Sequence, residues 1–127
     1  MLSDAEIERG KQSTTYSLKQ EEPLHEHNDC VRIAYEWLDA QVKTNGVSRK
    51  PRALKHIIEQ WGGRYVSTSD VDVAAELHPE IHGKYPFFNI SSRLTRPAKR
   101  RLTGIGQAFT QGYTESATLA NYKADEQ

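Results

Sequence analysis

The chain has 127 residues, a common size for one domain, and its 17 basic and 17 acidic residues cancel. Apolar residues make up only 36%, so we expect part of the chain to lie outside the core. No apolar run approaches the roughly 20 residues that span a bilayer, and the start lacks a signal-peptide pattern. With a lone cysteine, Cys30, this composition argues against a membrane partner and favours a cytoplasmic location.

Both ends of the chain are predicted to be flexible. Residues 1–26 are polar and acidic and show no helical or strand period, so they bury too little surface to offset the entropy of ordering. Residues 112–127 look similar, which leaves one helical domain at residues 27–111. Deleting residues 1–24 should then leave the thermal stability nearly unchanged.

The first predicted helix covers residues 28–44 and can be capped by Asn28 or Asp29. Gly46, after Asn45, accepts the left-handed conformation that closes a helix. The apolar stripe of this helix, at steps of three and four, consists of Cys30, Ile33, Ala34, Trp37, Leu38 and Gln41.

A second helix is predicted over residues 51–61, because Pro51 suits a first turn and Gly62-Gly63 stops the pattern. Its buried stripe consists of Leu54, Ile57, Ile58 and Trp61. The β-prone residues 64–66 then form an extended link or a small strand.

A third helix is predicted from Ser69 to His78. Ser69 and Asp72 resemble a capping box, and Pro79 ends the helix. Its buried positions include Val71, Ala74 and Ala75.

Two further helices are predicted after an aromatic connector at residues 79–88. Asn89 can cap a short helix over residues 90–95, and Pro97 fits the first turn of a last helix over residues 97–110. The inner face of the last helix would be Leu102, Ile105, Ala108 and Phe109. The expected fold is therefore mainly α, a compact bundle of four or five short helices with a minor β element.

The basic stretch around the helix over residues 90–95 is the strongest functional signal, because no acid occurs between Glu80 and Glu115. Arginine, serine and asparagine side chains suit phosphates and base edges. The nucleic-acid-binding residues predicted here are Asn89, Ser92, Arg93, Arg96, Lys99, Arg100 and Arg101. A second basic group lies around residues 43–55 and consists of Lys43, Arg49, Lys50, Arg52 and Lys55. Of this group, Lys50, Arg52 and Lys55 would contact phosphate beside the first set.

Residues 69–101 resemble a helix-turn-helix of the winged kind found in small bacterial regulators, with the helix over residues 69–78 as the brace. A typical turn has three or four residues, whereas about ten separate the two helices here, and no wing hairpin is evident. The resemblance implies a non-enzymatic protein that binds double-stranded DNA, either in transcription regulation or as an accessory factor, and that can act as a homodimer. The simpler interpretation is a solvated basic face.

A protein-binding adaptor or inhibitor is the alternative function. Tyr85, Phe87 and Phe88 would then be the partner-binding residues, together with the charged tails. Exposed aromatics favour this protein-protein interaction, whereas buried aromatics beside an exposed ridge over residues 93–101 favour nucleic acid.

No catalytic residue, metal or cofactor is predicted. Cys30 lies on an apolar stripe, where a thiol is more often inert than nucleophilic. His25, His27 and Cys30, with His78 and His82, include ligand types that zinc prefers, but their spacings match no common zinc module.

Overall fold

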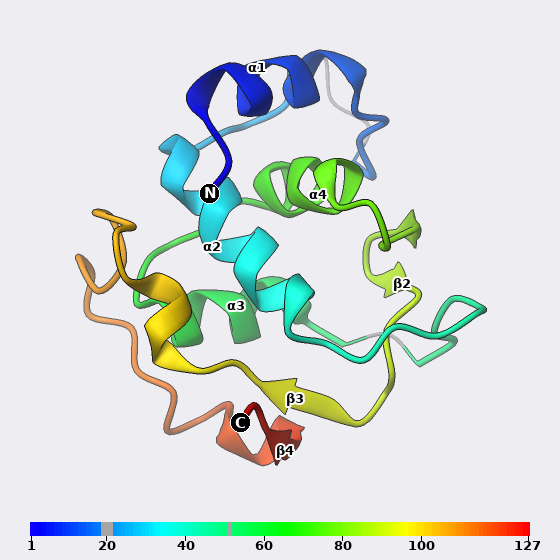
Figure 1. Ribbon diagram of the computed structural model, residues 1–127, viewed down its shortest axis with the longest axis vertical. Helices are drawn as coiled ribbons and strands as arrows, with labels where there is room; N and C mark the ends of the chain where they lie inside the picture. Colours follow the sequence, from blue (N-terminus) through cyan, green and yellow to red (C-terminus); the bar gives the residue numbers. More distant parts are fainter. Residues whose placement is uncertain (19–21, 51) are drawn as a thin grey trace.

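The computed structural model describes residues 1–18, 22–50 and 52–127, so the predicted role of Pro51 lies outside the described residues. The four α-helices of the described part are α1 (Asp4–Ser13), α2 (Asn28–Asp39), α3 (Leu54–Gly62) and α4 (Thr68–Leu77). Helix α2 runs through the middle and packs mainly against α4, with α3 on another side (Figure 1). The predicted mainly α, compact fold is confirmed.

Short strands and 3-10 turns complete the structure. An antiparallel hairpin joins β1 (Gly83–Lys84) to β2 (Phe87–Phe88), and β3 (Leu94–Arg96) pairs in parallel with β4 (Tyr122–Asp125). Lys43 makes an isolated antiparallel bridge with Ile90. The two 3-10 turns are η1 (Lys99–Leu102) and η2 (Leu119–Asn121).

The apolar stripes predicted for the three helices between residues 28 and 78, which are α2, α3 and α4, are buried and form the core. Gly63 has a φ of 65° and closes α3, as the sequence predicts. The N-cap of α4 lies two residues before the predicted one, because Ser67 and Asp70, rather than Ser69 and Asp72, form the reciprocal capping box.

The predicted absence of a helix from residues 1–26 is wrong. Ser3 and Glu6 form a capping box for α1, and Ile7 is fully buried in the core. Helix α1 packs against α4 at Gly10, where an added Cβ would lie 3.0 Å from the side chain of Leu77. The chain near this end is therefore part of the fold.

Helix α2 ends at Asp39, earlier than predicted, and it is capped by neither Asn28 nor Asp29: the side chain of His27 accepts the cap hydrogen bond. After the end of α2, the side chain of Gln41 hydrogen-bonds to the backbone of strand β3, as a neighbouring strand would. Its amide donates to the carbonyl of Thr95 and accepts from the same residue's N–H, each at 2.9 Å. The backbone of residues 42–44 pairs outside the helix as well: the N–H of Thr44 donates to the carbonyl of Asn89 at 2.9 Å, and the carbonyl of Val42 accepts from the N–H of Ser91 at 2.8 Å.

The helices predicted over residues 90–95 and 97–110 are also wrong. Residues 94–96 are strand β3, and the second segment contains only η1 followed by turns. Phe109, with a φ of 61°, lies outside the helical region and its N–H donates to the carbonyl of Gly62 at 2.8 Å. Docking onto the end of α3 thus satisfies backbone groups that a helix would otherwise have paired.

Residues 112–127 contact the rest of the molecule through β4. The Tyr122 hydroxyl accepts a 2.9 Å hydrogen bond from the buried indole of Trp37. Among the described helices, none is long and apolar enough to cross a membrane.

Candidate functional site

Asn89 was predicted to offer its amide to a base edge from an exposed helix, but it is only 3% exposed. Its Oδ1 accepts from the N–H of His82 at 2.7 Å, and its Nδ2 donates to the carbonyl of Glu80 at 2.9 Å. The amide therefore serves the backbone that leads into the hairpin, and it faces away from solvent.

The second half of the predicted basic segment is paired with carboxylates from elsewhere in the chain. Arg96 and Lys99 contact Glu115 at 2.8 and 2.6 Å. Burial acts to raise the pKa of Glu115, but the hydrogen bonds from these two cations hold it below its ordinary value. Arg100 is exposed and donates to the terminal backbone oxygen of Gln127.

Arg101 is the most heavily paired cation of this segment. Its guanidinium contacts Glu36, Asp39 and Glu126 at 3.0, 2.9 and 2.6 Å. The hydrogen bonds from Arg101 lower the pKa of Glu126 to about 2. The acids missing from the local sequence are thus supplied by α2 and the C-terminal residues.

A different set of cations gathers where the chain after α2 meets the hairpin. Thr44 and Ser48 donate from their backbone N–H groups to the carbonyls of Asn89 and Phe88, both at 2.9 Å. Arg52 donates to the carbonyl of Ser92 at 2.9 Å. The two segments consequently lie side by side at one edge of the molecule (Figure 1).

We call the surface formed by residues 42–50, 52 and 81–94 the basic end. Its segments contain no aspartate or glutamate, and their lysines and arginines are Lys43, Arg49, Lys50, Arg52, Lys84 and Arg93. Within the described residues, the ion pairs involve none of its four exposed cations, Arg49, Lys50, Lys84 and Arg93. Lys55, by contrast, is paired with Glu59 and lies over the ring of Tyr65.

An open hollow of about 340 Å³ lies within the basic end. Arg49 and Lys50 contribute to one side of it, and Ser91 and Ser92 to the other. Ser92 was predicted as a binding residue and is exposed, as is Arg93. Cations and hydroxyls around an open surface suit an anion such as phosphate.

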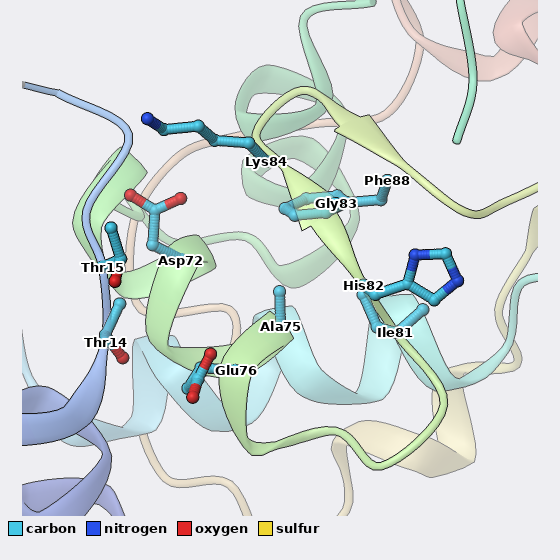
Figure 2. A pocket seen from close by; sticks show the side chains of 10 residues that line it. All are labelled: Thr14, Thr15, Asp72, Ala75, Glu76, Ile81, His82, Gly83, Lys84 and Phe88. Atoms are coloured by element: carbon cyan, nitrogen blue, oxygen red, sulfur yellow. The ribbon is translucent and has the colours of Figure 1, made fainter. Parts of the chain in front are cut away.

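A smaller pocket of about 190 Å³ adjoins the hairpin between α4 and residues 14–15 (Figure 2). Lys84 and Asp72 extend toward the same rim, while His82 lies on the other side of β1. Burial raises the pKa of Asp72, whose carboxylate accepts two hydrogen bonds from Ser17. Lys84 therefore lies where the basic end meets the acidic side chains of Asp72 and Glu76, which line the same pocket.

The three connector aromatics have different surroundings. Phe88 is 1% exposed, and the half-buried Tyr85 packs edge-on against it while its hydroxyl accepts from the N–H of Lys55. Phe87 is 40% exposed. The connector thus mainly covers the core, with one ring left at the surface.

His25, His78 and Cys30 have structural partners. His25 contacts the buried Asp70 at 2.8 Å, and His78 contacts Asp39 at 2.8 Å. Burial raises the pKa of the Cys30 thiol to about 12. Among the described residues, no three histidine, cysteine or acidic side chains gather as a metal site would require.

Arg49, a member of the second basic group, and Lys84 were not among the predicted binding residues, although a signal existed: residues 42–52 and 81–94 both lack acids. None of the known family models matches the chain, and no curated protein or solved structure matches it either.

Proposed function

We propose that the chain is a small DNA-binding protein whose basic end contacts the phosphates of double-stranded DNA. The observation that carries this proposal is that two hydrogen-bonded segments contain six cations and no acid, and that four of these cations are exposed. Each phosphate that a cation neutralises releases condensed counterions, and this release supplies affinity even in a protein of zero net charge. Arg49, Lys50 and Arg93 are the principal contacts in this proposal, with Arg52 and Ser92 beside them.

The order of the elements supports a winged-helix arrangement as part of the proposal. Helix α2 is followed by the bridging residue Lys43, then by α3 and α4, and then by the hairpin that leads to Ile90. In such an arrangement the hairpin is the wing. The wing and the loop beside it carry the exposed cations, so they contact the DNA backbone.

In the proposed arrangement α4 would be the recognition helix, but its chemistry argues against reading bases. It carries Asp70, Asp72 and Glu76, and carboxylates repel phosphates. Its N-terminal half is also covered, because Asp70 hydrogen-bonds to His25 and Asp72 accepts a hydrogen bond from Ser17. We therefore propose binding mainly to phosphates, which suits an accessory factor or a regulator of broad sequence preference.

The test is fluorescence anisotropy with a labelled random-sequence duplex at several salt concentrations. The variant Arg49→Ala/Lys50→Ala/Arg93→Ala should bind more weakly, and its slope of log affinity against log salt should be shallower by roughly 2 to 3. The matched control Arg9→Ala/Arg100→Ala/Lys123→Ala removes three exposed cations elsewhere and should change the slope by less than one. Equal losses in the two variants would contradict a localised site.

A protein-binding function is the second candidate, and the exposed ring of Phe87 favours it together with Val47, which is 44% exposed. If the unmodified protein did not bind the duplex at low salt, the DNA-binding proposal would be contradicted and a protein-binding function would be favoured.

A further inference from the structure

Phe87 is unusual because its neighbour in β2 is almost fully buried. Phe88 points into the core, whereas Phe87 is 40% exposed at the start of the returning strand. Side chains alternate between the two faces of a strand, so burial of Phe88 sends Phe87 outward. A ring with this exposure keeps one part packed on the hairpin and leaves another part free.

One cation stands beside Phe87 in the hairpin, and two more lie on the adjoining loop. Lys84 is directly opposite it in the hairpin register, so the two side chains stand on the same face. The loop that carries Arg49 and Lys50 is held against the same hairpin by the hydrogen bond from Ser48 to Phe88. Val47 contacts the hairpin at Gly83, which is the register partner of Phe88, since a Cβ on Gly83 would lie 2.8 Å from its Cγ1.

An exposed ring among cations has a specific use in nucleic-acid binding. Every base has a flat face that stacks on an aromatic side chain, and nearby lysines and arginines hold the adjoining phosphates. A base inside an intact duplex has both faces covered by its neighbours. The ring therefore suits a base that is unpaired or at the end of a duplex.

We propose that Phe87 stacks on an unpaired base next to the duplex phosphates held by the basic end, so that the preferred ligand is DNA with a single-stranded extension. This inference rests on the proposed function. It adds a class of ligand, because phosphate contacts alone do not distinguish a blunt duplex from one with an overhang.

The experiment compares three labelled DNAs: a blunt duplex, the same duplex with a short thymidine overhang, and a single strand of thymidines. The unmodified protein should bind the overhang duplex about tenfold more tightly than the blunt one, within the range that stacking of one base supplies. Phe87→Ala should lose this preference while keeping its affinity for the blunt duplex and its salt slope. Phe87→Trp should keep the preference, because it preserves a stacking ring.

Folding is checked first by thermal melting of each variant, and Phe87→Leu serves as a control that keeps apolar bulk without a ring. Equal binding of blunt and overhang duplexes by the unmodified protein would overturn the stacking inference but leave the proposed function standing. A Phe87→Ala variant that keeps the overhang preference would overturn it in the same way. Failure to bind any of the three DNAs would overturn both proposals, and the exposed ring would then fit a protein partner.

Discussion

At the scale of single residues, Asn89 illustrates how one side chain supports two different predictions. An asparagine before a short run of residues suits a helix cap, because its side chain can accept from backbone N–H groups. The same chemistry lets it bridge the backbones of His82, Glu80 and Thr44 from a buried position. Whether Asn89 caps a helix or bridges buried backbone segments is decided only by the packing of the hairpin against residues 42–50.

The Asn89→Ala substitution should therefore lower the free energy of unfolding, by about 2–3 kcal/mol, because it leaves buried backbone groups without partners. Ser92→Ala, at an exposed position nearby, should change it by less than about 0.5 kcal/mol. Chemical denaturation of both variants measures the difference. Equal stability of Asn89→Ala and the unmodified protein would contradict the structural role.

Glu126 gives a pH dependence with a defined sign. Its pKa falls from 4.5 to about 2 on folding, so its stabilising effect is complete above pH 4.5 and is lost as the pH falls through 2. Glu126→Gln should cost about 1–2 kcal/mol at pH 7, since the pair with Arg101 is partly exposed. The stability difference between the two proteins should shrink between pH 4.5 and 2, and a difference independent of pH would contradict this assignment.

At the scale of elements, α1 was missed because its apolar face is very small. Ile7 is the one large apolar side chain among residues 4–13, so no periodic stripe exists. The capping box of Ser3 and Glu6 was nevertheless readable in the sequence. Gly10 completes the contact by permitting close approach to Leu77.

Ile7→Ala should destabilise the protein by about 2–4 kcal/mol, because it opens a cavity between α1 and the core. Arg9→Ala, at an exposed position on the same helix, should have little effect. Deleting residues 1–24 should likewise lower the melting temperature, contrary to the expectation from sequence. A deletion that melts at the original temperature would show that α1 contributes nothing to the fold.

The helices α2, α3 and α4 were predictable, because each carries a stripe of buried side chains with helical period. Prediction failed after Asn89, where long-range contacts determine the backbone. Gln41 pairs with Thr95, and Gly62 accepts from Phe109. Such bonds between distant residues leave no periodic pattern in either segment.

At the scale of the whole molecule, local charge in the sequence was a poor guide to charge at the surface. Residues 96–101 lack acids in the sequence but meet Glu36, Glu115 and Glu126 in the fold. The exposed cations of the basic end, which are Arg49, Lys50, Lys84 and Arg93, form no ion pair with a carboxylate among the described residues. The candidate site therefore lies on residues 42–50, 52 and 81–94, whereas the sequence predicted it mainly on residues 89–101, with Lys50, Arg52 and Lys55 beside them.

The location of DNA binding is the central claim, and an NMR titration of the labelled protein with a short duplex tests it most directly. Backbone amide signals should shift chiefly at residues 44–50 and 82–93, with little change along residues 96–101. Shifts concentrated at residues 96–101 or on α4, or no shifts at low salt, would contradict the proposed interface.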